Sequence, residues 1–423
     1  MLESATARLH ASHPGDAAHV HPTQRFAARR PNHAPKHVRS HKRRNLGRGV
    51  ALAVTGVLAF AAAAIPTAAM QLQGNIASVA TDYFLNTVQR PEPVVVGEPE
   101  SPQALNILVL GTDGRNSAEN VELGGYVEGV RSDTTIVMHI SADRQHIAMV
   151  SIPRDSIVDI PACPTTTPGR YTTARPNTRF NAAFAFGFDA GRDIGSGAIC
   201  TMHTIEQATN VRLDGFIAVD FNGFKNMVDA LGGVEMNIPN AIYAPMADGL
   251  RLDPGYQTLD GWQALQFARA RIGQGLGDGS DLRRIERQQD LLAAIALNVL
   301  SRNLLTDAPA LLQFLGATTS SLTMSDNLSS LTGLNALAGS MQGISPDNIQ
   351  FITIPNMLNP ANPNTVVWLP EAEDVWNSLR YSDSLFSDSE SDDVDDHVAT
   401  DADADVDAEN GGSAITDAAG VTG

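Results

Sequence analysis

The sequence has few lysines and cysteines, and it lacks the motifs of several large enzyme classes. Only Lys36, Lys42 and Lys225 occur among 423 residues, so almost every cation beyond the first 48 residues is an arginine. The two cysteines do not have the spacing of a cysteine-based metal site. The absence of GxSxG and HExxH argues against serine acyl transfer and zinc peptidase chemistry. The glycine-rich stretch 272–280 lacks the GxxxxGK[ST] and GxGxxG patterns, so it does not by itself predict nucleotide binding.

Charge is distributed unevenly along the chain. The formal net charge is −18, yet residues 1–48 carry ten Lys/Arg against two acidic residues, and residues 382–423 carry thirteen Asp/Glu and no Lys/Arg. Nucleic-acid binding needs a basic surface that neutralises the phosphate backbone. We therefore expect no nucleic-acid partner for this acidic protein.

The N-terminal part of the sequence predicts a membrane anchor. Residues 1–48 are rich in His, Arg, Pro and Ala and are predicted to form a disordered basic cytoplasmic arm. Residues 49–70 are uncharged and mostly apolar, which is about the length of one transmembrane helix. The basic flank on their N-terminal side predicts that the following domain lies on the extracellular side of the cell membrane. A cleaved signal peptide is the alternative, since small residues occur near Ala68.

Residues 71–104 are predicted to form a stem, 105–380 a globular domain and 381–423 a disordered acidic tail. A tail that binds cations or a partner is the alternative reading of that last segment. Apolar strands alternate with amphipathic helices in the globular part, which predicts a layered α-β-α domain around a central mixed sheet. The predicted strands are 106–111, 134–140, 146–152, 215–221, 234–238 and 349–354. The predicted helices are 180–187, 197–210, 222–232, 260–271, 281–300, 308–320 and 327–341.

Two of the predicted strands define one edge of the sheet where charged residues gather. The polar segment 141–145 is short, so strands 134–140 and 146–152 are expected to form a hairpin. Arg131 and Asp133 precede the first strand and Arg154 follows the second, so antiparallel pairing brings them together. If strand 106–111 runs parallel to the second hairpin strand, Asp113 and Arg115 arrive at the same edge. Ligands of layered α/β folds bind at such strand ends.

The helix predicted over 281–300 begins its apolar face with charged and polar residues. Arg284 and Gln288 share the face of the later leucines, with Arg287 at its rim, and Asp281 is a suitable N-cap. An inward-facing arginine keeps its proton and needs an anionic partner. A pyrophosphate with Mg²⁺ or Mn²⁺ would satisfy several such arginines and the two aspartates at once. Arg269 and Arg271 precede the glycine-rich stretch and join this candidate set.

The two cysteines, Cys163 and Cys200, are compatible with one disulfide in an exported domain. Two free thiols are the alternative. His139 and His203 lie in apolar runs and are predicted to be packed core histidines.

Seven blocks of the sequence resemble the LytR-CpsA-Psr family of membrane-anchored ligases of bacterial cell-wall glycopolymers. The match extends over about residues 105–300 in the order of the family. The blocks are NILVLGTDGR, RSDTTIVMHI, IAMVSIPRDSIVDIP, FNAAFAFG, GFIAVDFNGFKNMVDALGGVEMNIP, LDGWQALQFARAR and DLRRIERQQ.

The resemblance implies a reaction in which a glycopolymer moves from a polyprenyl-pyrophosphate carrier to peptidoglycan and a phosphodiester forms. It implies that Asp113 and Asp133 hold Mg²⁺ or Mn²⁺, and that an apolar tunnel between sheet and helices holds the isoprenoid. The catalytic set would be Arg131, Asp133, Arg154 and Arg284. The pyrophosphate ligands would be Arg131, Arg154, Arg269, Arg271, Arg284, Arg287 and Gln288.

Three points stay open in the sequence. The general base that deprotonates the acceptor could be Asp155 or Asp281, and either could instead orient arginines. A lipid-pyrophosphate phosphatase would use the same residues with water as the acceptor. A non-enzymatic envelope regulator that binds glycans or lipid phosphates would need the arginines and the anchor but not the paired aspartates.

Overall fold

The structure is a computed structural model that describes residues 76–95, 98, 101–114, 129–277, 279, 281–301, 316, 322–330, 340–341 and 344–381. The predicted basic arm, the apolar segment 49–70, the acidic tail beyond Tyr381 and Arg115 lie outside these residues. So do the predicted helix 308–320, apart from residue 316, and most of the predicted helix 327–341. No helix within the described part of the chain is long and apolar enough to cross a bilayer.

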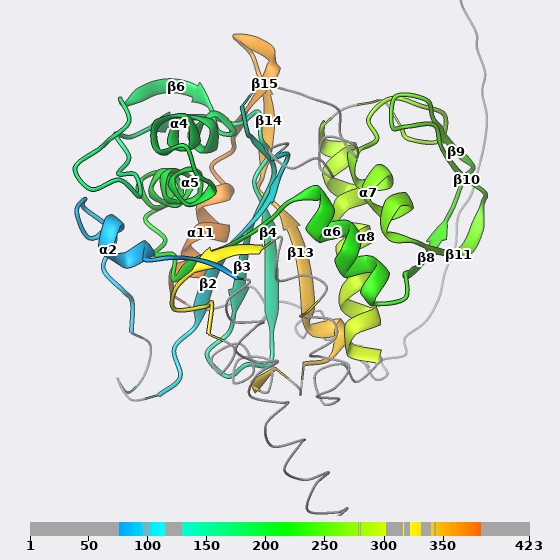
Figure 1. The fold of residues 1–423 in the computed structure, drawn as a ribbon, viewed down its shortest axis with the longest axis horizontal. Coiled ribbons are helices and arrows are strands. Elements are labelled where there is room, and N and C mark those ends of the chain that lie inside the picture. Colours follow the sequence, from blue (N-terminus) through cyan, green and yellow to red (C-terminus); the bar gives the residue numbers. More distant parts are fainter. Residues whose placement is uncertain are drawn as a thin grey trace, which may run out of the picture. The chain divides into compact units, whose positions relative to one another are not determined.

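A seven-stranded mixed sheet forms the centre of the fold, in the order β1-β12-β7-β2-β3-β4-β13 (Figure 1). Strands β2, β7, β4 and β13 run in one direction, while β3, β12 and β1 run in the other. The strands are β1 (Ala77–Val79), β2 (Leu105–Thr112), β3 (Ser132–Ile140), β4 (Ile147–Ser151), β7 (Gly215–Val219), β12 (Leu322–Ser325) and β13 (Ile349–Thr353).

The predicted hairpin and its neighbour are confirmed. β3 and β4 pair antiparallel, with Ile136 opposite Ser151 and Ile140 opposite Ile147. β2 lies antiparallel to β3 and therefore runs in the same direction as β4. The C-terminal ends of β2 and β4 thus meet the N-terminal end of β3 at one edge of the sheet, which is the edge that the sequence predicts for the charged residues.

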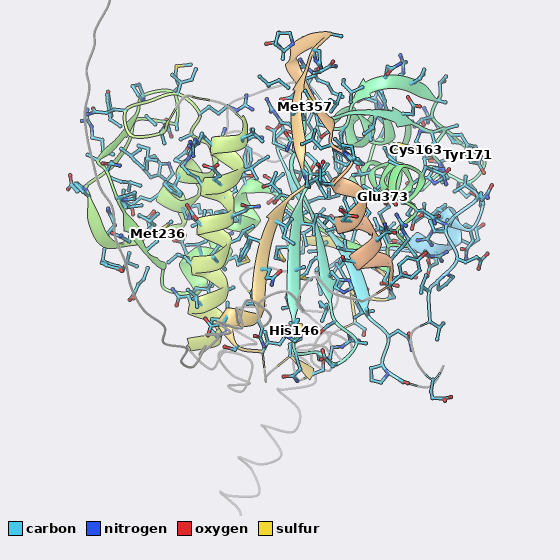
Figure 2. The ribbon with its side chains drawn as sticks, turned by 180° about the vertical axis from the view of Figure 1, so that it is seen from behind. His146, Cys163, Tyr171, Met236, Met357 and Glu373 are labelled. Atoms are coloured by element: carbon cyan, nitrogen blue, oxygen red, sulfur yellow. A yellow bond between two sulfur atoms is a disulfide. The ribbon has the colours of Figure 1, made fainter. Side chains whose placement is uncertain are left out.

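Helices cover both faces of this sheet, as the α-β-α prediction requires (Figure 1). One face packs against α4 (Ala182–Gly191), α5 (Ile194–Thr209) and α11 (Ala372–Tyr381). Within this layer α4 and α5 pack closely at Gly187. A Cβ atom there would lie 2.2 Å from the Ser196 carbonyl oxygen, so only glycine fits. The predicted disulfide is present and joins Cys163 to Cys200 in α5, and Figure 2 shows Cys163 beside this helix layer.

The other face carries α6 (Phe221–Ala230), α7 (Gly261–Arg269) and α8 (Asp281–Ser301), which share a second apolar core with two small sheets. The strand predicted over 234–238 is present as β8, but it pairs with β11 rather than with the central sheet. The small strands are β8 (Val234–Ile238), β9 (Ile242–Ala244), β10 (Leu250–Leu252) and β11 (Gly255–Leu259).

Part of the predicted stem folds against the sheet. β1 lies within residues 71–104 and forms the outer strand beside β12, and α2 (Thr81–Leu85) follows it. Arg90 then ties this segment to α5, because its guanidinium binds the fully buried carboxylate of Glu206 at 2.7 Å. A second bond reaches the carbonyl oxygen of Leu213 at 2.8 Å. This buried ion pair fixes the residues that precede β2.

Two histidines lie in the core, and we expect them to lower the free energy of unfolding in acid. His139 and His203 are both buried, and burial lowers the pKa of each to about 4. Both are neutral in the folded protein at pH 5 to 7, whereas in the unfolded chain they take up protons below about pH 6.5. Their stabilising contribution is therefore complete above about pH 6.5 and is lost as the pH falls toward 4, by at most about 1.4 kcal/mol per pH unit for each histidine.

Urea unfolding between pH 7 and pH 4.5 measures this effect. The variant His139→Gln/His203→Gln should show a shallower fall of unfolding free energy over the same range. An identical slope in the variant and the wild type would contradict the assignment.

Candidate active site

Asp133 occupies a β-bulge at the edge where the charged residues were expected. In the β2–β3 pairing Gly111 lies opposite Thr134 and Thr112 lies opposite Ser132, so Asp133 is the extra residue. A bulge redirects the side chains of its strand. Asp133 and its neighbour Thr134 consequently both line the same hollow.

This hollow lies between the sheet and α8 and opens to solvent. Asp133 and Arg154 contribute to it from the ends of β3 and β4, while Arg284 and Gln288 contribute from the first turns of α8. The remaining lining residues are Thr134, Thr135, Ile136, Ser151, Ile152 and Ile285. Four residues of the predicted site, drawn from three distant segments, therefore share one cavity.

Asp133 is held between two arginines in this hollow. Arg154 Nη1 lies 2.6 Å from Asp133 Oδ1, and Arg284 Nη2 donates to the Asp133 carbonyl oxygen at 3.1 Å. Burial by itself would raise the pKa of Asp133, but the charges of Arg154 and Arg284, with a smaller effect of Arg271, lower it below its usual value. Arg284 is only 3% exposed, so the guanidinium at the start of the apolar face of α8 points into the site rather than into solvent.

Asp113 and Arg131 are bound to each other at the neighbouring strand end. Arg131 N donates to Asp113 Oδ1 at 2.5 Å, and Asp113 N donates to the Arg131 carbonyl oxygen at 3.0 Å. Asp113 is buried, whereas the side chain of Arg131 is exposed. This pair lies where β2 ends and β3 begins, one strand from the hollow, and neither residue lines it.

The donor set at this edge fits a hard divalent cation only in part. Asp113 and Asp133 supply carboxylate oxygens, which Mg²⁺ and Mn²⁺ prefer. In the part of the chain that the structure describes, no group of three or more His, Cys, Asp or Glu residues is placed to hold a metal ion. An ion bound by these two aspartates would therefore complete its shell with water and with oxygens of a bound substrate.

The other predicted arginines have different surroundings. The Arg269 guanidinium stacks over the Phe221 ring at 4.3 Å. Arg271 follows the end of α7, which stops at Arg269 because Ala270 is extended (ψ 132°), so the helix predicted to Arg271 is two residues too long. The side chain of Asp281, the predicted N-cap, lies outside the described part of the chain.

Arg287 and Gln288 bind backbone rather than other charged groups in the described residues. Arg287 Nη1 donates to the Leu276 carbonyl oxygen at 2.8 Å, and Nη2 donates to that of Ala270. Burial lowers the pKa of Arg287. Gln288 Nε2 donates to the Ala268 carbonyl oxygen at 3.1 Å. These contacts attach α7 and the loop that follows it to α8. The pyrophosphate role of Arg287 stays a prediction.

Gln289 holds α8 against the sheet, a role that the sequence did not indicate. Its Nε2 donates to Ser151 Oγ at 3.2 Å and to Thr353 Oγ1 at 3.1 Å, which joins α8 to the ends of β4 and β13. Gln289 directly follows Gln288 in the helix, but nothing in the sequence indicates that its hydrogen-bond partners are hydroxyl groups on two strands.

Replacing Gln289 by Ala should lower the unfolding free energy by about 1 kcal/mol, because a net hydrogen-bond contribution of that size is lost. Urea unfolding measures the change. The exposed Asp290→Asn on the same helix serves as the control, and an equal effect in both variants would show that the strand contacts of Gln289 do not matter.

The comparisons with known proteins agree with this architecture. The chain is 34% identical over 213 residues to the polyisoprenyl-teichoic acid–peptidoglycan teichoic acid transferase TagU of Oceanobacillus iheyensis, covering 50% of this chain and 57% of that protein. It is 31% identical over 226 residues to the TagU of Enterococcus faecalis, covering 53% and 63%. The chain therefore spans less than two thirds of the length of either relative.

The fold also matches a solved structure, protein gbs0355 from Streptococcus agalactiae, with a TM-score of 0.51 at 19% identity, covering 66% of this chain and 88% of that one. A profile of the LytR_cpsA_psr family matches residues 69–381, which include β1, the central sheet and α11. The resemblance based on the seven sequence blocks is thereby confirmed. The chain belongs to the LytR_cpsA_psr family.

Proposed function

We propose that this protein is a phosphotransferase that moves a glycopolymer from a polyprenyl-pyrophosphate carrier to peptidoglycan, with formation of a phosphodiester. The observation that carries the proposal is the convergence of Arg154, Arg284 and Asp133 on one hollow. Two permanent cations and one carboxylate line the hollow, so the lining keeps positive charge for a ligand. Guanidinium groups also match phosphate oxygens in geometry. The names of the two relatives, both transferases that join teichoic acid to peptidoglycan, support the same chemistry.

The sheet face beside the hollow supports a lipid carrier. Ile136 and Ser151 line the hollow, and Met138 and Met149 follow two residues further along the same face of their strands. Both methionines are only partly buried and pack against a buried cluster that contains Ile107 and Ile140. An apolar face that starts at the arginines suits an isoprenoid chain attached to a pyrophosphate.

The proposed reaction divides the work among the residues of the hollow. The hydroxyl oxygen of the acceptor attacks the sugar-linked phosphorus, the bond to the bridging oxygen of the diphosphate breaks, and polyprenyl phosphate leaves. Arg154 and Arg284 bind the diphosphate and stabilise the charge that grows on the leaving phosphate. A Mg²⁺ or Mn²⁺ ion held by Asp113 and Asp133 would supply further neutralisation of the phosphate oxygens. The acceptor hydroxyl loses its proton to a base as the new phosphodiester bond forms.

The location proposed for the protein is the cell membrane. The uncharged segment 49–70 and its basic flank support a single-pass protein of the cell membrane with this domain on the extracellular side. There the lipid-linked donor and peptidoglycan would both be within reach.

A transfer assay with the full-length protein in detergent tests the proposal. With Mg²⁺ present, polyprenyl phosphate should be released from a lipid-pyrophosphate-linked glycan only when an acceptor glycan is added. Release at the full rate without acceptor would instead support a lipid-pyrophosphate phosphatase. Donor binding without turnover in either metal would support a non-enzymatic regulator.

A further inference from the structure

The residue after Arg154 is a carboxylate that faces two arginines. Asp155 lies in the turn Pro153–Ser156, which is closed by the Ser156 N–H donating to the Pro153 carbonyl oxygen at 3.0 Å. Asp155 Oδ2 is 3.4 Å from Arg154 Nε, and Oδ1 is 3.4 Å from Arg179 Nε. Its side chain is 18% exposed. Asp155 therefore approaches Arg154 at Nε, whereas Asp133 approaches it at Nη1.

The second arginine is fixed by other strands. Arg179 ends β6 (Arg175–Arg179), and its Nη2 donates to the Asn364 carbonyl oxygen at 3.2 Å in β15 (Asn362–Trp368). The backbone around Asp155 is bound to the same elements, because Val366 N donates to the Asp155 carbonyl oxygen at 3.0 Å and Asn181 N to that of Arg154 at 3.1 Å. The carboxylate is thus held at a fixed place relative to the hollow.

We propose that Asp155 is a positioning residue that orients the Arg154 guanidinium toward the bound diphosphate, with Arg179 as its anchor; this rests on the proposed function. The Asp155 carboxylate lies 3.4 Å from Nε and attracts the guanidinium by its charge, which favours the orientation in which Nη1 meets Asp133 in the hollow. Arginine binds phosphate well only when its planar fork is correctly oriented. A shift of about 1 Å in such a group can reduce a rate by about a hundredfold.

The arrangement also decides between the two roles that the sequence left open for Asp155. A general base must reach the proton of the acceptor and accept it. Asp155 is not among the residues that line the hollow. Protonation would also remove both of its ion pairs. Orientation of Arg154 is the role that fits these contacts.

The variant Asp155→Asn tests the proposal, because it removes the charge and keeps the shape. Titration calorimetry of the full-length protein with inorganic pyrophosphate and Mg²⁺ should show binding about ten- to a hundredfold weaker than in the wild type. KM for the lipid-linked donor should rise by a similar factor. The matched control is Asp159→Asn in β5 (Ile157–Ile160), where the exposed carboxylate accepts the Asn177 N–H at 2.9 Å. Pyrophosphate binding of this variant should change less than about twofold.

The same substitution in the variant Arg154→Lys distinguishes orientation of Arg154 from other roles of Asp155. Lysine has no Nε–H in a guanidinium plane, so in Arg154→Lys the added Asp155→Asn should weaken pyrophosphate binding by less than about twofold. An equal loss in both backgrounds would overturn the proposal. Unchanged pyrophosphate binding in Asp155→Asn would also overturn it. A fall in kcat alone, with loss of the acidic limb of the pH–rate profile, would show instead that Asp155 is the general base.

Two further results complete the test. If Asp155→Asn does not fold, Asp155→Glu keeps the charge and displaces Arg154, and weaker pyrophosphate binding at an unchanged melting temperature is expected; wild-type binding would contradict the proposal. If the wild type binds pyrophosphate but transfers no glycan, the proposed function fails, while the binding comparison still decides the role of Asp155.

Discussion

Removal of divalent cations by a chelator is expected to reduce glycan transfer by the full-length protein at least about a thousandfold. The reason lies in the charges of the hollow. Arg154 and Arg284 together carry two positive charges, and Asp133 already neutralises one of them. A diphosphate therefore needs a further cation to balance the charge that develops on its oxygens. The loss should be reversed by Mg²⁺ or Mn²⁺, and polyprenyl phosphate release measures both steps.

The control is the melting temperature of the protein with and without chelator. We expect little change, because the cores on both sides of the sheet are built from apolar side chains and involve no metal. Full activity in the chelator would contradict the assignment of Asp113 and Asp133 as cation ligands and leave the arginines to act alone.

Replacing Arg154 by Ala should reduce transfer by about a hundred- to a thousandfold, equivalent to about 2.7–4 kcal/mol of transition-state stabilisation. The change removes the cation that lies at 2.6 Å from Asp133 and lines the hollow. It also leaves the carboxylate without its closest partner, so the site loses both a phosphate ligand and its local charge balance. Steady-state kinetics with the lipid-linked donor measures the loss.

Arg283→Ala is the matched control for this variant. Arg283 lies on the same helix as Arg284, but its side chain is 57% exposed and pairs with Glu286 at 2.7 Å on the outer surface. Exposed pairs of this kind contribute less than about 1 kcal/mol. Near wild-type transfer in Arg154→Ala, or an equal loss in Arg283→Ala, would remove the basis for assigning the hollow as the active site.

Several parts of the site could be predicted because they follow from chain direction and helical period. The short segment 141–145 predicted the β3–β4 hairpin, and the hairpin in turn placed Asp133 beside Arg154. The 3.6-residue period placed Arg284 on the buried face of α8, where it is 3% exposed. Neither inference required knowledge of long-range packing.

Other features depend on contacts between distant segments and could not be predicted. β12 (Leu322–Ser325) has only four residues, two of them polar, and it becomes a strand because β7 and β1 offer it partners on both sides. By contrast, α11 buries Ala372, Trp376 and Leu379, whose i, i+4, i+7 spacing is that of a helix face, so this helix could have been predicted from the sequence.

The surroundings of the arginines were the least predictable part. The sequence places Arg284 on the apolar face of the helix and Arg287 at the rim of that face, and both were predicted to bind pyrophosphate. In the structure Arg284 points into the hollow, whereas Arg287 binds the carbonyl oxygens of Ala270 and Leu276. The difference comes from the loop after α7, which brings the Ala270 and Leu276 carbonyl oxygens within reach of Arg287.

A crystal structure of the protein with Mg²⁺ and a polyprenyl-pyrophosphate analogue tests the central claim most directly. The diphosphate is predicted to lie in the hollow in contact with Arg154 and Arg284, with the isoprenoid along the face that carries Met138 and Met149. A diphosphate bound elsewhere, or a hollow that stays filled by the Arg154–Asp133 pair while the analogue binds at another surface, would contradict it.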